Sequence, residues 1–120
     1  MTVNPQRGEI WQVNLAPTIG QEINKKRPVI VISSDLYSPI ALRIVIPVTT
    51  WQDKFINRPF MVKIYKNNLN GLIRNSAGNV LQIRSIATQR FINKLGLISS
   101  KIMEQLLLAL IISVDYSSDT

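Results

Sequence analysis

Apolar and polar residues alternate in the segment EIWQVNL (9–15), where Trp11, Val13 and Leu15 share one side of the chain. A period of two predicts a strand with one buried face. The run PVIVIS (28–33) is continuous and β-branched, which is typical of a central strand buried on both faces. Further strands are predicted over 41–50, 60–65 and 79–86, with a short one around 95–97.

In two of these strands the sequence also predicts where particular residues lie. Pro47 has no backbone N–H to donate, so it predicts a bulge or an edge position near the end of the strand 41–50. In 79–86, the alternation places Gln82 and Arg84 on the same side.

Helical periodicity is found near the C-terminus. From Lys101 to about Ser113, apolar residues recur at spacings of three and four, and Ser100 is placed to cap the helix. The uninterrupted apolar stretch 106–112 fits a buried helix face. We expect residues 113–120 to form a frayed tail.

Polar segments containing Gly, Pro or Asn separate these elements, at 16–26, 51–59 and 66–78, with a turn or one short helical turn over 34–40. About five strands followed by one helix predict a mainly β fold. The expected form is a small, strongly bent antiparallel sheet or barrel with the helix packed on it. The 120 residues are expected to make a single domain, 1–120.

Composition excludes several kinds of chemistry. The chain has no Cys and no His, so it has no thiolate nucleophile, no imidazole base and no Cys-ligated zinc. Its seven acids are scattered singly, which does not suggest a two-metal nuclease. We therefore expect no metal ion and no cofactor. No targeting signal and no apolar run of about 18 residues is present, so a cytoplasmic protein is expected.

The charge is strongly positive in the body of the chain. Lys and Arg number 14 against 7 acids, a net +7, and three of the acids lie after residue 103, so residues 1–103 carry 14 − 4 = +10. Such a surplus attracts polyanions, with nucleic acid as the first candidate. Solubility alone is the competing explanation.

Four positions are candidates for chemistry. Arg27 precedes Pro28, and the residue before a proline is restricted to an extended backbone. A guanidinium on such a restricted backbone suits phosphate recognition, because it can bind two phosphate oxygens at once. Thr49 ends the strand 41–50 and can donate a hydrogen bond to a phosphate oxygen, while Trp51 can stack on a base or cover the core. Glu22 is either a partner of the neighbouring lysines or a general base.

Three of these residues, Glu22, Arg27 and Thr49, lie in segments that match a known family. RGEIW (7–11), PT-x-G-x-E (17–22) and RPVIVIS (27–33) closely resemble the opening of MazF/PemK-type toxins, the mRNA interferases of type II toxin–antitoxin systems. IPVTT (46–50) and QIRSI (82–86) are similar to later segments of the family, in the same order.

The resemblance implies a Src-homology-3-like barrel with a C-terminal helix, assembled as a homodimer. It implies metal-independent cleavage of single-stranded RNA at a short sequence, and a cognate antitoxin with an acidic or disordered segment. Arg27 and Thr49 match the catalytic arginine and threonine, and Glu22 matches a loop acid implicated in cleavage or substrate contact. The residues expected to bind RNA are Gln21, Lys25, Lys26, Thr50, Trp51, Gln52, Gln82 and Arg84.

The sequence departs from the family pattern at two places. The Glu-Gln-x-Gly loop signature is replaced by EINK (22–25), and Leu81 stands where many relatives carry an acid. A proton transfer by that acid cannot operate here, which leaves Glu22 as the candidate base.

Three alternatives remain open at this stage. One is a toxin of the gyrase-poisoning CcdB kind, which shares the barrel but cleaves nothing. Another is a non-catalytic RNA- or DNA-binding module, and the third is a degenerate family member that retains only the antitoxin contact. Incubation with RNA in EDTA separates cleavage from binding.

Overall fold

The computed structural model describes residues 3–16, 19–22 and 26–118. Within these residues the chain forms seven β-strands, four 3₁₀ turns and one α-helix. The strands are β1 (Glu9–Asn14), β2 (Lys26–Val31), β3 (Leu42–Thr50), β4 (Met61–Ile64), β5 (Ser76–Asn79), β6 (Arg84–Ala87) and β7 (Phe91–Leu97). The turns are η1 (Asp35–Tyr37), η2 (Asp53–Asn57), η3 (Val80–Gln82) and η4 (Thr88–Arg90), and the helix is α1 (Ser100–Ser113).

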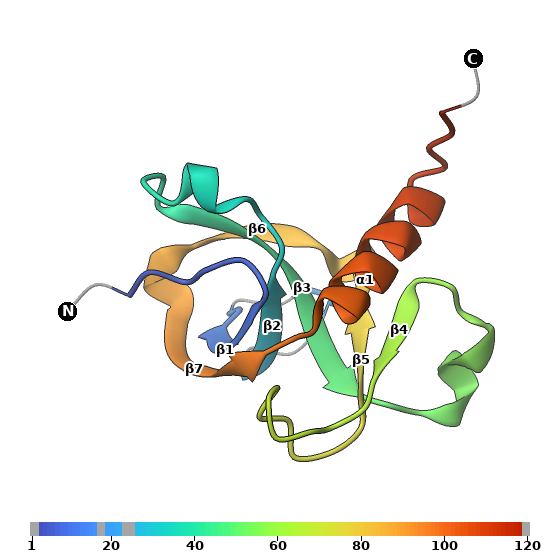
Figure 1. Cartoon of the computed structure of the whole chain (residues 1–120). Coiled ribbons are helices and arrows are strands. Elements are labelled where there is room, and N and C mark those ends of the chain that lie inside the picture. The colour runs from blue at the N-terminus through green and yellow to red at the C-terminus, as the bar shows by residue number, and fades with distance from the viewer. Residues whose placement is uncertain (1–2, 17–18, 23–25, 119–120) are drawn as a thin grey trace.

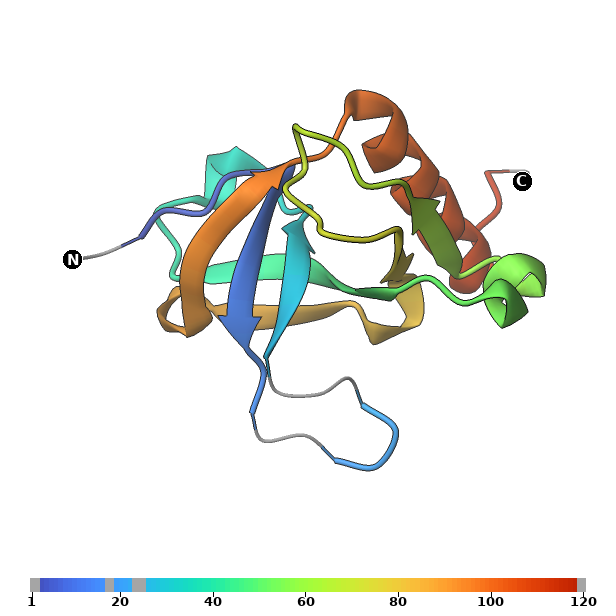
Figure 2. The same cartoon turned by 90° about the horizontal axis from the view of Figure 1, so that it is seen from below.

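The strands pair antiparallel in the order β4-β5-β3-β2-β1-β7, and β6 also pairs with β3. β3 is shared between two partners on one side, because residues 42–45 pair with β6 and residues 48–50 with β5. The sheet therefore bends along β3, with β1, β2 and β7 on one side and β4, β5 and α1 on the other (Figures 1 and 2). The predicted fold class, a bent antiparallel sheet with one C-terminal helix, is confirmed.

The core consists of two apolar clusters on opposite faces of the central strands. Val29, Val31 and Val45 lie in the cluster enclosed by the curved strands, together with Trp11 and Phe91. Their neighbours Ile30 and Ile46 lie in the cluster that α1 covers with Met103, Leu106 and Ala109. The segment 28–33 is thus buried on both faces, as predicted, although β2 itself begins at Lys26 and ends at Val31.

A glycine allows α1 to approach the sheet closely. Gly78 is buried in β5, and a Cβ added there would lie 2.8 Å from Cδ2 of Leu106. Because Leu106 is fully buried at this contact, a side chain at position 78 would force Leu106 out of its present position in the core.

The predicted bulge at Pro47 is wrong, whereas the predicted edge position holds locally, on one side of β3. Pro47 is buried and pairs in register with Val29, with no bulge between β2 and β3. On the other side of β3, pairing with β6 ends at Val45 and pairing with β5 begins at Val48. Pro47 occupies the gap between the two partners, where a missing N–H costs no ladder hydrogen bond.

The same gap explains why 79–86 is not one strand. β5 and β6 pair with different parts of β3, and residues 46–47 of β3 have no partner on that side. The chain between β5 and β6 runs beside these unpaired residues as the 3₁₀ turn η3. The inference that Gln82 and Arg84 share one strand side is therefore wrong, because Gln82 belongs to η3. The short strand expected around 95–97 is also longer, beginning at Phe91.

The helix begins one residue before its predicted start. Ser99, not Ser100, is the N-cap, and its Oγ accepts a hydrogen bond from the N–H of Ile102 (3.2 Å). The apolar stretch 106–112 is not one buried face, since a helix turns its residues through all directions: Leu106 is buried, but Leu108 and Ile112 are 51% and 64% exposed.

The residues after α1 close the helix in an ordered way. Asp115 has a φ of 58°, in the left-handed region. The N–H of Tyr116 donates to the carbonyl of Ile111 (3.0 Å), and the N–H of Asp115 donates to the carbonyl of Ile112 (3.1 Å). This pattern is a Schellman motif. The segment assigned to a frayed tail therefore begins with a hydrogen-bonded cap.

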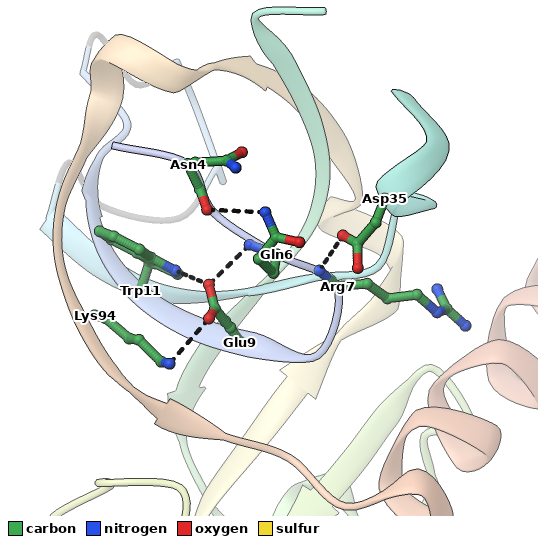
Figure 3. Close-up of polar contacts among 7 residues, drawn as sticks. All are labelled: Asn4, Gln6, Arg7, Glu9, Trp11, Asp35 and Lys94. Carbon is green, nitrogen blue, oxygen red and sulfur yellow. Dashed lines mark hydrogen bonds and ion pairs between the residues drawn. The ribbon is translucent and has the colours of Figure 1, made fainter. Parts of the chain in front are cut away.

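A polar cluster fixes the N-terminal segment to the barrel (Figure 3). The Glu9 carboxylate accepts hydrogen bonds from the Gln6 backbone N–H (2.8 Å) and the Trp11 indole (2.9 Å), and it pairs with Lys94 (2.9 Å). Burial alone would raise the pKa of Glu9, but these hydrogen bonds and the Lys94 charge together bring the pKa below its ordinary value. Beside them, the Arg7 N–H donates to Asp35 (2.8 Å).

In the described part of the chain, α1 and the 3₁₀ turns are too short or too polar to cross a bilayer.

Candidate active site

The pairing of β2 with β3 brings two predicted residues together. Val29 lies opposite Pro47 in this antiparallel pair. The recorded pairing ends there, and Arg27 and Thr49 each lie two residues beyond it, near the ends of their strands. Residues two apart on a strand project from the same face, so Arg27 lies on the face of Val29 and Thr49 on the face of Pro47. The end of the β2–β3 pair thus brings these residues, 22 positions apart (49 − 27), to the lining of one pocket.

Arg27, Thr49 and Thr50 line one pocket of about 160 Å³. It is open on one side and lies where β2 begins and β3 ends. The remaining wall is formed by Pro28, Val48, Leu72, Ile73, Arg74 and Ser76. The pocket is thus a small concave site whose lining includes two arginines, two threonines and a serine beside four apolar residues.

Arg27 has spare hydrogen-bonding capacity. Its residue is partly buried, and its Nε is buried with no hydrogen-bond partner among the described residues. A buried donor without a partner costs folding free energy, so its retention at a pocket favours a role toward a ligand. A guanidinium is the side chain best suited to two oxygens of a phosphate at once.

The two threonines are held differently. Thr49 is half-buried and pairs with Ala77 of β5, whereas Thr50 is exposed and pairs with Ser76. Thr49 is therefore the more enclosed of the two hydroxyl-bearing residues.

The structure does not bring the loop acid to this pocket. Glu22 is exposed, and its Oε1 accepts a hydrogen bond from the N–H of Ile19 (2.8 Å), which closes a local turn. Gln21 and Lys26 are also exposed and do not line the pocket. Lys25 lies outside the described residues. The roles expected for these four residues stay predictions.

Trp51 and Gln52 continue the chain directly after Thr50. The Trp51 ring contacts Phe55 edge-on, with ring centres 5.6 Å apart, and the Lys63 ammonium lies 4.8 Å from its centre. Trp51 is therefore partly engaged with its own chain, while Gln52 is exposed. Neither residue lines the pocket.

Gln82 and Arg84 lie in η3 and β6 and are also not part of the pocket lining. Leu81, at the position where many relatives carry an acid, is 58% exposed. The predicted RNA contacts of Gln82 and Arg84 would have to come from a surface beyond this pocket.

Sequence reasoning missed the wall formed by residues 72–76. The sequence predicts an irregular segment over 66–78 and therefore gives no pairing of this segment with β3, whereas residues 76–79 form β5 and pair with it. The signal that could have found Arg74 is its position two residues before Ser76, which pairs with Thr50.

The pocket is basic and holds no metal-binding group. None of its lining residues is Asp, Glu, His or Cys, and the described residues contain no cluster of three such side chains anywhere. A cationic pocket with hydroxyl donors can bind a phosphate and stabilise added negative charge on its oxygens.

The chain resembles characterised proteins over nearly its whole length. Endoribonuclease MazF9 of Mycobacterium tuberculosis is 38% identical over 116 residues, covering 92% of this chain and 96% of that protein. The structure of MazF from Deinococcus radiodurans superposes with a TM-score of 0.78 at 20% identity, covering 95% of this chain and 99% of the other. MazF in a MazE–MazF structure from the same organism superposes with a TM-score of 0.74 at 22% identity, covering 96% and 99%.

The family model described as a PemK-like, MazF-like toxin of type II toxin–antitoxin systems matches residues 6–114. This match includes every wall residue of the pocket and all seven strands. The protein therefore belongs to the PemK/MazF family of toxins of type II toxin–antitoxin systems.

Proposed function

We propose that the protein is an endoribonuclease that cleaves single-stranded mRNA without a metal ion, and that the pocket of Arg27 and Thr49 is its active site. The observation that carries this proposal is the unpartnered, buried Nε of Arg27 in a pocket with the Thr49 hydroxyl. The name of the relative from Mycobacterium tuberculosis, endoribonuclease MazF9, supports the reaction class.

RNA supplies its own nucleophile, so the protein needs to orient and stabilise rather than to activate water. The ribose 2′-oxygen forms a bond to phosphorus as the bond to the 5′-oxygen breaks. The products are a 2′,3′-cyclic phosphate and a 5′-hydroxyl. Arg27 neutralises the charge that grows on the phosphoryl oxygens, and Thr49 donates a second hydrogen bond to them.

The proton of the 2′-hydroxyl must leave and the 5′-oxygen must receive one. Since the pocket lining has no carboxylate, the base has to reach it from outside that lining. Glu22, on the connection that leads into β2, is the candidate that the sequence predicts. Glu22→Gln should then lower kcat with little change in KM, whereas a rise in KM at unchanged kcat would assign Glu22 to substrate contact instead.

Cleavage in EDTA tests the proposal most directly. The protein is incubated with a long RNA in excess EDTA, and primer extension locates the cuts. Polynucleotide kinase should label the downstream fragments without prior phosphatase treatment, because their ends are 5′-hydroxyls. Arg27→Ala protein, purified in parallel, controls for contaminating ribonuclease.

Three results would contradict the proposal. Cleavage that needs added metal would remove the proposed chemistry. RNA binding without cleavage would favour a nucleic-acid-binding module, and neither binding nor cleavage would favour a toxin that acts on a protein, like the gyrase poisons of related fold.

We also propose that the chain acts in the cytoplasm as a homodimer that a cognate antitoxin inhibits. Large apolar side chains remain exposed on α1, at Leu108, Ile112 and Val114, and near the start of β3, at Leu42 and Ile44. Exposed apolar surface of this kind favours contact with another protein chain. The net charge of +7 favours an acidic antitoxin segment, and the MazE–MazF structure of D. radiodurans supports a partner of that class.

Light scattering and titration test these contacts. The isolated protein should have twice the mass of one chain at micromolar concentration, and a monomer would contradict the dimer. The antitoxin should abolish RNA cleavage, and the association should weaken as salt rises if charge contributes.

A further inference from the structure

We propose that Arg74 binds a phosphate of the RNA next to the scissile one, which makes it a substrate-binding residue of the active site. This inference rests on the proposed function. Arg74 lines the same pocket as Arg27 and Thr49 but comes from a different part of the chain, the connection between β4 and β5.

The connection that carries Arg74 is built around one buried asparagine. Asn70 is 1% exposed, and its side-chain amide donates to the carbonyl of Tyr65 (2.9 Å). Its Oδ1 accepts from the N–H groups of Asn67 (3.2 Å) and Leu72 (3.0 Å). One side chain thus holds three backbone positions of the connection together.

A glycine then anchors the connection to β7. Gly71 has a φ of +68°, and a Cβ there would lie 2.1 Å from the carbonyl oxygen of Leu95. The N–H of Leu97 donates to the carbonyl of Leu69 (3.0 Å). The close backbone contact between the two segments excludes a side chain at Gly71 and leaves little freedom of position.

The backbone on both sides of Arg74 is held as well. Ser76 Oγ donates to the carbonyl of Arg74 (2.9 Å). The next residue, Asn75, accepts at its carbonyl from the N–H of Trp51 (3.0 Å) and at its Oδ1 from the N–H of Lys66 (3.1 Å). Arg74 is therefore mounted on a fixed backbone beside the end of β3, as Arg27 is mounted at the start of β2.

The Arg74 side chain has a free charge. Arg74 is exposed, and among the residues that the structure describes its guanidinium makes no ion pair and no hydrogen bond. No acid among the described residues lines the pocket, so neither Arg74 nor Arg27 has a counter-ion in that lining. An RNA strand carries one negative charge per nucleotide, so a second arginine of the pocket matches a second phosphate.

The division of work between the two arginines follows from their burial. Arg27 is partly buried with a desolvated Nε, which suits the growing charge of the transition state. Arg74 is exposed, so its contact is made equally in the ground state and the transition state, and it contributes to substrate binding rather than to the chemical step.

The test compares Arg74→Gln with Lys101→Gln, which removes the same charge from an exposed residue of α1 outside the pocket. Arg74→Gln should raise KM about tenfold, the loss of one exposed phosphate contact, with kcat within about twofold of wild type. Lys101→Gln should change neither. Arg74→Lys should recover most of the loss, because it keeps the charge.

A binding measurement separates this inference from the proposed activity. The affinity for a single-stranded RNA that lacks the 2′-hydroxyl at the cleaved nucleotide is measured over a range of salt concentrations. Arg74→Gln should reduce the slope of log Kd against log salt by about 0.7, the value for one phosphate contact on a single strand.

The outcomes are distinct. If the wild-type protein cleaves RNA and Arg74→Gln changes neither KM nor the salt slope, the role of Arg74 is wrong and the proposed function stands. A fall in kcat as large as the fall in kcat/KM would also overturn it, because Arg74 would then act in the chemical step. If the wild-type protein does not cleave RNA, the proposed function fails, and the salt slope still tests Arg74 as a phosphate contact.

Discussion

Arg43 and Arg27 are both arginines of the central strands, yet their surroundings are opposite. Arg43, on β3, is 5% exposed, and every nitrogen of its guanidinium donates to the protein. Its acceptors are the carbonyls of Pro5 (2.9 Å), Ser38 (3.1 Å), Ile40 (2.6 Å) and Leu42 (2.8 Å) and the side chain of Asn4 (2.9 Å). Arg27, at the start of β2, has a buried Nε with no acceptor and opens onto a pocket.

The comparison shows how one residue type serves two purposes. A guanidinium whose nitrogens all donate to protein oxygens, as those of Arg43 do, stabilises the fold and has nothing left for a ligand. One that is partly desolvated and unsatisfied costs stability and is available for binding. Mutation should therefore distinguish the two arginines. A substitution of Arg27 should mainly lower the cleavage rate, and a substitution of Arg43 should mainly lower the free energy of unfolding.

The largest expected effect is on catalysis at Arg27. Arg27→Ala should lower the cleavage rate by a factor on the order of 10²–10³, the usual cost of removing one transition-state donor. The free energy of unfolding should change by less than about 1 kcal/mol, because the lost donor had no partner. Cleavage kinetics and urea denaturation measure the two quantities. Cleavage at the wild-type rate would end the assignment.

Arg43→Met should give the reverse result. The substitution keeps an apolar stem but leaves buried carbonyls without a donor, so we expect a loss of about 2–4 kcal/mol in the free energy of unfolding. At a temperature where the variant is folded, its cleavage rate should match wild type. A variant as stable as wild type would show that the comparison between the two arginines is wrong.

Thr49 tests whether a second side chain of the pocket acts in cleavage together with Arg27. Thr49→Val removes the hydroxyl and keeps the shape, and the rate should fall roughly tenfold to a hundredfold, the value of one hydrogen bond to a charged group. Thr49→Ser keeps the hydroxyl and should recover most of the rate. Equal activity of the Val and Ser variants would exclude the proposed hydrogen bond.

The smallest expected effect is the loss of stability at Glu9, an acid whose charged group, like that of Arg43, makes hydrogen bonds within the protein. Its pKa is below the ordinary value in the folded protein, so the ionised form stabilises the fold at pH values above its unfolded pKa, and this contribution disappears as the pH falls through the folded pKa. Glu9→Gln should therefore be less stable than wild type near neutral pH, with the difference shrinking in acid. Thermal unfolding at several pH values measures it, and a difference that does not vary with pH would contradict the assignment.

Local signals predicted the parts of the site that depend on neighbours in sequence. Arg27 was found because Pro28 fixes its backbone, and Thr49 because it ends a long strand. The register that joins them follows from two adjacent antiparallel strands. In contrast, Arg74 depends on contacts between residues far apart in the chain, such as those of Gly71 with Leu95, which no periodicity contains.

The errors in the fold have a common origin. Pro47 and the break between β5 and β6 are consequences of one strand serving two partners. A single stretch of sequence indicates that a strand exists, but not how many neighbours it has or where one neighbour replaces another. The alternation over 79–86 was real at the level of burial for Val80 and Ile86, and it did not require a continuous strand.

The hydrogen bonds of the buried Asn70 have a consequence for which positions of the connection between β4 and β5 can vary. Its hydrogen bonds go to main-chain groups, apart from one to the neighbouring asparagine, so the shape of the connection does not depend on what its outward side chains are. Asn68 and Ile73, both solvent-facing, can be exchanged without refolding the segment. Substitutions at these two positions can thereby change the surface that the connection presents to solvent while its backbone, and Arg74 with it, keeps its place.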